Sequence, residues 1–158
     1  MSDVLDPAKV LRVERTVGAP RDLVFEAFSD ARHLDAWWGP NGFTNETHAM
    51  EFAVGGLWHY TMYGPDGKVW PNWIRYTEIS PPSRIAYEHG AELGEAAHFN
   101  GIITFEDEGG RTRVSLILVF ATKEARDATL EFGAVEGGNQ TLAKLDAYVQ
   151  RTARAAGP

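Results

Sequence analysis

Between Phe43 and Ala121 the sequence consists of short segments with a period of two, separated by turn-forming residues. Residues 64–67 (Gly-Pro-Asp-Gly) are typical of a hairpin turn, because proline presets φ and glycine is free to adopt a positive φ. Gly109-Gly110 is a second hairpin signal. This pattern predicts a largely antiparallel sheet, with a loop or one helical turn at residues 90–97. The expected strands cover residues 43–52, 57–63, 69–79, 84–89, 99–106 and 112–121.

The segment before this region predicts one strand and two short helices. Residues 10–17 alternate in the manner of a strand. Ala19-Pro20 opens a first helix, because proline suits the first helical turn, and Ser29-Asp30 can cap a second helix over residues 31–36.

The segment after Thr122 predicts two further helices, over residues 123–132 and 135–154. The second of these carries one apolar stripe, formed by Val135, Leu142, Leu145 and Val149. The order of the elements predicts an α+β architecture in a single domain, residues 1–158, with its core at about residues 10–154. A long terminal helix that crosses a curved sheet can leave a space beneath it.

Composition excludes several classes of protein. The formal charge of -7 argues against a nucleic-acid partner, and the absence of cysteine excludes disulfides and thiolate chemistry. The longest apolar run, residues 116–121, is far shorter than the about 20 residues of a membrane-spanning helix. No secretory signal is visible at the N-terminus, so a cytoplasmic location without membrane association is expected. No histidine pair at ligand spacing, phosphate-binding loop or dinucleotide fingerprint is present, so neither a metal nor a cofactor is expected.

Several motifs in this order resemble the START-like superfamily, also called the helix-grip or polyketide cyclase superfamily. More narrowly, the chain resembles bacterial relatives of the activator of heat-shock protein 90 ATPase. The motifs are Ala19-Pro20 with Val24-Phe25, residues 34–40 (LDAWWGP), residues 55–58 (GGLW), residues 64–67 (GPDG), residues 79–82 (ISPP) and residues 137–145 (GGNQTLAKL). The resemblance implies a curved antiparallel sheet of about six or seven strands wrapped around the long C-terminal helix. It also implies an apolar cavity under that helix, and no single reaction.

Aromatic residues supply the candidate wall of such a cavity. All five tryptophans lie between Phe25 and Tyr76, where they either fill a core or line a pocket. Strand parity predicts that Trp58, Tyr60 and Met62 face the same way, and it leaves the inward face of the other strands open. Trp70 is expected on the outer face. The candidate ligand-binding residues are Trp37, Trp38, Phe43, His48, Trp58, Tyr60, Met62, Trp73, Arg75, Tyr87, Phe99, Phe105, Phe120, Phe132, Gly138, Asn139 and Leu142.

Gly138 and Asn139 lie on the apolar stripe of the last helix, where many relatives carry a tryptophan near Gly137-Gly138. Glycine inside a helix costs about 1 kcal/mol against alanine, and a buried asparagine needs partners. Either the glycines mark a close approach and Asn139 bonds the backbone, or the missing side chains leave room for a ligand. A Gly138→Trp variant would then fill part of the cavity.

A few polar residues are candidates for anchoring or chemistry. Arg15 and Arg75 share strand parity with apolar neighbours, so each either reaches the rim and pairs with an acid or anchors an acidic ligand group. His48 is a candidate general base, with a surface histidine as the ordinary alternative. Glu131 and Glu136 lie at a pocket mouth or simply favour a helix N-terminus.

Three functions follow in order of preference. The first is binding of a small apolar or aromatic molecule, lipid-like or polyketide-like. The second is a cyclase or hydrolase that uses the same cavity. The third is a co-chaperone-like interaction domain, for which a chaperone partner is the least favoured of the three. A homodimer through an edge strand or exposed rings stays open.

Overall fold

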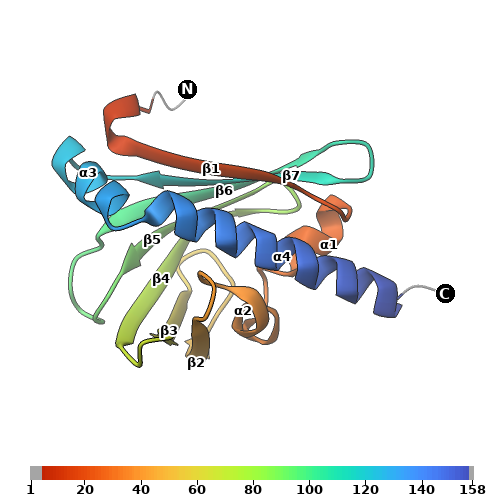
Figure 1. The fold of residues 1–158 in the computed structure, drawn as a ribbon, viewed down its shortest axis with the longest axis horizontal. Helices are drawn as coiled ribbons and strands as arrows, with labels where there is room; N and C mark the ends of the chain where they lie inside the picture. The colour runs from red at the N-terminus through yellow and green to blue at the C-terminus, as the bar shows by residue number, and fades with distance from the viewer. Residues whose placement is uncertain (1–4, 157–158) are drawn as a thin grey trace.

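One antiparallel sheet of seven strands, in the order β1-β7-β6-β5-β4-β3-β2, forms the framework of the protein. The computed structural model describes residues 5–156, and Figure 1 shows the long helix α4 lying across the sheet. The strands are β1 (Val10–Val17), β2 (Thr44–Met50), β3 (Leu57–Tyr63), β4 (Val69–Ser80), β5 (Arg84–Gly90), β6 (Phe99–Asp107) and β7 (Thr112–Val119). The helices are η1 (Pro7–Lys9), α1 (Arg21–Glu26), α2 (Ala31–Trp37), α3 (Lys123–Glu131) and α4 (Ala134–Ala156).

The element order that the sequence predicts is confirmed, and so is the α+β helix-grip fold. The strand expected over residues 43–52 is shorter in the structure, where β2 ends at Met50. The chain turns back at Gly56, whose Cβ would lie only 2.2 Å from the carbonyl oxygen of Glu51 if it had one. Phe52 therefore leaves the strand and packs its ring against Tyr76 in the core, 5.0 Å between ring centroids. The short helix η1 is an addition that the sequence pattern did not indicate.

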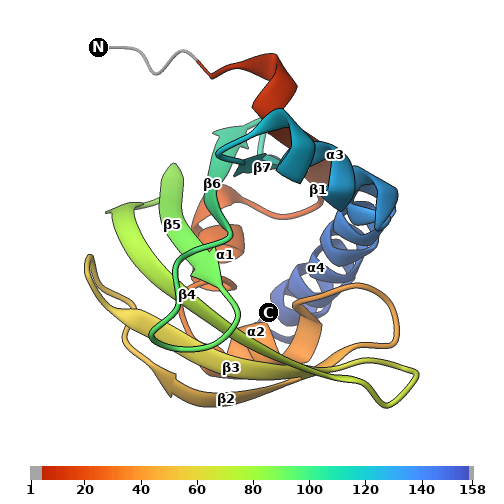
Figure 2. The ribbon, with the colours of Figure 1, turned by 90° about the vertical axis from the view of Figure 1, so that its left-hand side faces the viewer.

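The sheet curls around α4. Figure 2 shows the strands passing from β1 and β7 through β5 and β4 to β3 and β2, with α4 across the open side. Register shifts in β2, between Thr47 and Ala49, and in β4, between Tyr76 and Glu78, mark two irregularities in the ladder. Such bulges bend a strand and increase its twist, which helps a sheet to curve. The inner face of the sheet thus faces the helix along most of its length.

The core fills only part of the space between the sheet and α4. Leu142, Leu145 and Val149 of the predicted apolar stripe are fully buried there. They belong to one apolar cluster with rings from α1 and β6, such as Phe25 and Phe105, whose centroids are 5.1 Å apart. Val135, at the start of the same stripe, is 38% exposed. The packing is therefore solid toward the C-terminal half of α4 and open toward its beginning.

An ion pair holds α4 against β1. Arg15 donates from Nε to Asp146 at 3.0 Å, and the carboxylate also accepts from the backbone N–H of Gly18 at 3.0 Å and from Gln150 at 2.7 Å. Of the two alternatives that the sequence left open for Arg15, the structure therefore shows pairing with an acid of this chain rather than a free arginine inside the cavity. Burial by itself raises the pKa of Asp146. The three hydrogen bonds and the charge of Arg15 together lower it by more, so the pKa of Asp146 lies below the ordinary 3.8.

The variant Asp146→Asn is expected to lower the free energy of unfolding by about 1–3 kcal/mol at pH 7, because it removes a charged acceptor of three hydrogen bonds. A depressed folded-state pKa means that the carboxylate stabilises the fold above the unfolded-state value of 3.8, and that this contribution is lost as the pH falls through the lower folded-state pKa. The difference between wild type and variant should therefore narrow below about pH 4. Urea unfolding at several pH values measures this difference in the free energy of unfolding. Glu106→Gln, which removes an exposed carboxylate from β6, is the control; an equally large effect there would contradict the assignment.

No helix within residues 5–156 is both long and apolar enough to cross a membrane. The same residues contain no group of three or more histidine or acidic side chains arranged to hold a metal ion.

Candidate functional site

A cavity of about 510 Å³ lies between the inner face of the sheet and the first turns of α4. This volume falls within the range of small-molecule sites. Its walls come from five strands, from the loop that follows α2, and from the junction between α3 and α4. The lining residues are Leu11, Val13, Trp38, Gly39, Pro40, Phe43, Tyr60, Met62, Tyr87, His89, Phe99, Leu116, Leu118, Phe132, Gly133, Ala134, Val135, Glu136, Gly137, Gly138, Gln140 and Thr141.

The inner end of the cavity is built from stacked rings. Tyr60 on β3 is completely buried, and its ring stacks on Trp58 of the same strand at 3.8 Å between centroids. Trp38 at the end of α2 donates from Nε1 to the hydroxyl of Tyr60 at 3.2 Å and meets Trp58 edge-on. Burial raises the pKa of Tyr60 well above its ordinary value, so the hydroxyl stays protonated. This end is consequently rigid, aromatic and uncharged.

The mouth lies at the junction of α3 and α4. Phe132 is 80% exposed there, and its ring approaches Trp70 of β4 edge-on, with 6.2 Å between the centroids. The next residue, Gly133, has φ +93°, a conformation that side chains rarely adopt, and it separates the two helices. Three large apolar side chains are thus exposed close together at the entrance, those of Trp70, Phe132 and Val135.

The loop after α2 forms another side of the cavity and is fastened to α4. Lys144 donates from Nζ to the carbonyl oxygens of Gly39 and Pro40 at 3.2 and 3.3 Å. Gln140 accepts from the backbone N–H of Asn41 at 3.0 Å. Burial lowers the pKa of Lys144 below its ordinary value. These bonds place Pro40 and Phe43 over the open side of the curved sheet.

Gly137 and Gly138 bring α4 close to its neighbours. A Cβ on Gly138 would lie 2.8 Å from Cγ2 of Val13 on β1, whereas a Cβ on Gly137 would lie 3.3 Å from Cγ of Pro40. Of the two alternatives raised by the sequence, close approach is the one that the contacts show for Gly138. Both glycines also line the cavity, so the close approach and the open space adjoin each other.

The two glycines should respond differently to alanine. Gly138→Ala forces a methyl group against Val13 and is expected to cost about 1–2 kcal/mol of unfolding free energy, since overpacking outweighs the gain in helix propensity of about 1 kcal/mol. Gly137→Ala meets the edge of a proline ring in a loop and should be close to neutral. Chemical denaturation of both variants measures the difference, and a Gly138→Ala variant as stable as wild type would contradict the close contact with β1.

His89 is the one histidine in the lining of the cavity. It shares the inner face of β5 with Tyr87, and its ring stacks on Phe99 of β6 at 4.6 Å between centroids. Its Nδ1 is enclosed and has no hydrogen-bond partner among the described residues. Burial, with a smaller effect from His98, lowers the pKa of His89 to about 4. The imidazole is therefore neutral at physiological pH.

The structure brings eight of the seventeen candidate residues together around the cavity. They are Trp38, Phe43, Tyr60, Met62, Tyr87, Phe99, Phe132 and Gly138. Trp58 shares the face of Tyr60 and Met62, as strand parity predicts, but it supports the inner end from behind rather than lining it. Whether any of these residues contacts a ligand stays a prediction.

Four other candidates belong to the core. Trp37 donates from Nε1 to the carbonyl oxygen of Ala27 at 3.1 Å, and Phe105 packs its ring between Phe25 and Phe28. Phe120 covers Phe99 from the side, and Leu142 is fully buried in the stripe of α4. These four side chains fill the core. Composition alone could not distinguish such residues from the wall of a pocket.

The inner face of β4 carries Trp70 and Asn72 rather than the candidate residues Trp73 and Arg75. Trp70 and Asn72 pair with Met62 and Tyr60 of β3, so they follow the parity of the inner face, and the expectation of an outward Trp70 is wrong. Trp73 and Arg75 have the opposite parity. Trp73 is nevertheless buried, because its ring covers Gly90 and its Nε1 donates to the carbonyl oxygen of Glu92.

The polar candidates lie elsewhere on the surface. Arg75 is exposed and donates to the carbonyl oxygen of Gly55 at 3.2 Å, and His48 is exposed on β2, where its Nε2 bonds Thr61. Asn139 is exposed on α4 rather than buried on the apolar stripe. Glu136 reaches the rim of the cavity within the first turn of α4, and Glu131 is exposed at the end of α3. None of the three wrongly placed candidates, Arg75, His48 and Asn139, can anchor a molecule in the cavity.

Several lining residues were missed by the sequence analysis. Leu11 and Val13 of β1 and Leu116 and Leu118 of β7 form one wall opposite the aromatic end. Their alternation was visible, but aliphatic residues in strands say nothing about whether they meet a core or a void. His89 could have been predicted as a lining residue, because it lies two positions after the candidate Tyr87 in the same strand and such residues face the same side of a sheet.

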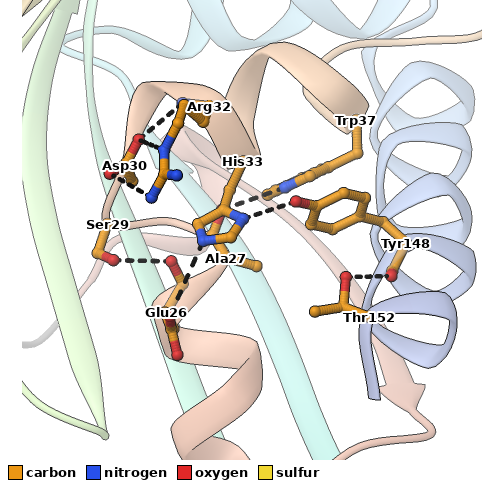
Figure 3. Close-up of polar contacts among 9 residues, drawn as sticks. All are labelled: Glu26, Ala27, Ser29, Asp30, Arg32, His33, Trp37, Tyr148 and Thr152. Carbon is orange, nitrogen blue, oxygen red and sulfur yellow. Dashed lines mark hydrogen bonds and ion pairs between the residues drawn. The ribbon is translucent and has the colours of Figure 1, made fainter. Parts of the chain in front are cut away.

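A polar cluster lies between α1, α2 and the C-terminal part of α4 (Figure 3), and none of the residues around it lines the cavity. His33 of α2 bonds the hydroxyl of Tyr148 of α4 through Nδ1 at 2.6 Å, and its Nε2 lies 3.9 Å from a carboxylate oxygen of Glu26. The hollow beside them measures about 20 Å³, barely the size of one water molecule. The cluster joins α1, α2 and α4 and offers no room for a substrate.

Comparison with known proteins gives one family and many similar folds. The model of the family described as activator of Hsp90 ATPase homolog 1-like protein matches residues 18–150. A protein from Arthrobacter aurescens is 27% identical with a TM-score of 0.83, covering 91% of this chain and 87% of that one. Proteins from Mycobacterium smegmatis (24% identity, TM-score 0.84, 96% and 98% coverage) and Nitrosomonas europaea (19%, 0.84, 94% and 98%) share the fold. A search of curated proteins finds no match.

The family match covers most of the sheet and most of α4, the elements that enclose the cavity. The fold is also that of the START-like proteins, which commonly bind hydrophobic ligands. The chain belongs to the family of activator of Hsp90 ATPase homolog 1-like proteins.

Proposed function

We propose that the protein binds one small apolar or aromatic molecule, lipid-like or polyketide-like in character, in the cavity beneath α4. The observation that carries this proposal is the cavity itself: about 510 Å³, open at one end and lined mainly by apolar side chains. Apolar walls of this kind release ordered water when an apolar molecule enters, and a few polar groups then fix its orientation.

The architecture of the mouth supports the same proposal. Phe132 and Trp70 lie edge-on across the entrance, and Gly133 beside them gives the α3–α4 junction a backbone that other residues rarely adopt. An apolar molecule that enters would contact the exposed ring of Phe132 and so remove it from water. Phe132, Trp70 and Val135 are exposed close together, and adjoining exposed apolar side chains of this kind are typical of a binding surface.

The test uses N-phenyl-1-naphthylamine, a neutral aromatic probe that fluoresces in apolar surroundings. Titration should saturate at one molecule per chain, and native mass spectrometry should show the matching complex. Near-ultraviolet circular dichroism must show that the protein stays fully folded, because partly unfolded proteins also bind such probes. A folded protein that binds neither this probe nor any member of a panel of lipids and polyketides would contradict the proposal.

The two other functions rest on weaker grounds. A cyclase or hydrolase needs groups that exchange protons near neutral pH, whereas burial keeps Tyr60, Tyr87 and His89 in their neutral forms. A co-chaperone role is tested by a pull-down with a bacterial chaperone of the heat-shock protein 90 class and by its ATPase rate, where we expect no stimulation. The oligomeric state is measured by light scattering, and a homodimer through exposed rings stays a prediction.

A further inference from the structure

Three rings with polar groups line the cavity, those of Tyr60, Tyr87 and His89, and each can donate a hydrogen bond to a bound molecule. Tyr60 already accepts a hydrogen bond from Trp38, so its own proton is free for an acceptor on a bound molecule. Tyr87 lines the same cavity from β5, and the hydroxyl end of its ring lies over Gly101 of β6. Burial raises the pKa of Tyr87, so this hydroxyl also keeps its proton at physiological pH.

His89 adds a third donor. Its enclosed Nδ1 has no partner among the described residues, and an orphaned N–H is rarer in proteins than an orphaned acceptor. The neutral ring therefore carries its proton on Nε2, the nitrogen farther from the backbone. Because His89 lines the cavity, this N–H is the one that a bound molecule can reach.

Among the described residues, the cavity lining contains no arginine or lysine. The nearby cations are engaged elsewhere: Lys144 bonds the carbonyl oxygens of the loop after α2, Arg15 is paired with Asp146, and Arg75 lies on the other face of β4. The only charged residue in the lining is Glu136, which is exposed at the mouth. A carboxylate placed among the rings would lose its hydration without gaining an ion pair, and this is costly. A neutral acceptor avoids that cost.

We propose that the cavity selects apolar or aromatic molecules with a neutral carbonyl oxygen at their inner end, and that His89 and Tyr87 donate hydrogen bonds to it, with Tyr60 beside them. This inference rests on the proposed function and names the chemical class of its ligand. A pocket built around buried donors discriminates strongly against a molecule that lacks the matching group, because the donors then stay unpaired.

The test compares two molecules of nearly the same shape, benzophenone and 1,1-diphenylethylene, which carries a methylene group in place of the carbonyl oxygen. Diphenylacetate supplies the carboxylate arm. Equilibrium dialysis against the full chain should show benzophenone binding at least about 10-fold more tightly than 1,1-diphenylethylene, equivalent to about 1.4 kcal/mol. Diphenylacetate should bind most weakly. In the infrared spectrum, the carbonyl stretch of bound benzophenone should move to lower frequency than in an apolar solvent.

His89→Phe and Tyr87→Phe keep the ring volume and remove one donor each. Each variant should reduce the preference for benzophenone to about 2- to 3-fold while leaving the affinity for 1,1-diphenylethylene unchanged, and the carbonyl stretch should move back. Tyr63→Phe removes an exposed hydroxyl from β3 outside the cavity and is the matched control. It should leave both affinities as in wild type.

Three results would overturn the inference. Equal binding of benzophenone and 1,1-diphenylethylene by the wild type would agree with the proposed binding of apolar molecules but would contradict selection by the hydrogen-bond donors. Tighter binding of diphenylacetate would show that the inner end accepts a charge. If neither neutral molecule binds a folded protein that still binds N-phenyl-1-naphthylamine, the inference fails and the proposed function stands; if neither that probe nor any member of the lipid and polyketide panel binds either, both fail.

Discussion

Leu118→Trp is expected to weaken binding of N-phenyl-1-naphthylamine by at least about 30-fold, or about 2 kcal/mol, while the protein stays folded. Leu118 lies on the inner face of β7 and lines the cavity. It pairs with Gly101 of β6, which in turn pairs with Tyr87 of β5, so a larger side chain at 118 extends toward the ring of Tyr87.

Leu118 is half-buried, and its side chain borders the open space of the cavity. The end of the Tyr87 ring covers Gly101 on the neighbouring strand, because a Cβ on Gly101 would overlap Cζ of Tyr87. The added indole therefore occupies cavity space rather than packed core, and the free energy of unfolding should change by less than about 1 kcal/mol, below the usual cost of overpacking.

The matched control is Ile102→Trp. Ile102 is half-buried next to Gly101 in β6, and alternation along the strand turns its side chain to the outer face. This variant adds the same indole to the neighbouring strand and should bind the probe as wild type does. Binding lost in both variants, or in neither, would contradict the position of the cavity.

Trp58→Ala is expected to lower the free energy of unfolding by about 3–5 kcal/mol, as is usual when a fully buried tryptophan is truncated. Trp58 is buried, stacks on Tyr60, meets Trp38 edge-on and donates from Nε1 to Thr47 of β2 at 3.0 Å. The substitution therefore removes the support of the aromatic end of the cavity along with a large apolar surface. For a protein of this size the melting temperature should fall by about 10 °C.

Trp70→Ala on the neighbouring strand provides the comparison. Its ring is partly exposed and contacts Phe132 at the mouth, so the free energy of unfolding should change by no more than about 1 kcal/mol. Denaturant unfolding, followed by circular dichroism, measures both variants. Equal losses at the two positions would show that the rings behind Tyr60 do not support this part of the fold.

The fold was predictable from sequence because its signals are local. Alternation of side chains marked the strands, and glycine–proline turns such as residues 64–67 marked the hairpins, so each element could be recognised without knowledge of its neighbours. The stripe of Leu142, Leu145 and Val149 likewise identified the buried face of α4. Only the ends of strands shifted, for example where Gly56 turns the chain back after β2.

The site was harder to predict because it depends on what each strand faces. In β4, bulky residues occupy both parities, and Trp73 is buried on the outer side by a contact with Gly90 that lies far away in sequence. Composition therefore could not tell the inner side from the outer one. Charged residues such as Arg75 are the obvious polar candidates in the sequence, but Arg75 is exposed on the outer face of β4. The polar groups at the aromatic end of the cavity are neutral instead, and they belong to rings that look like core residues in the sequence.

Isotope-filtered NMR on the complex with unlabelled N-phenyl-1-naphthylamine tests the hollow interior most directly. With ¹³C-labelled methyl groups in the protein, we expect nuclear Overhauser contacts from the probe to the methyls of Leu116 and Leu118 on β7. No contacts are expected to Val54 or Leu93, which are exposed and far from the cavity lining. Contacts confined to such exposed methyls, with none to β7, would contradict the account.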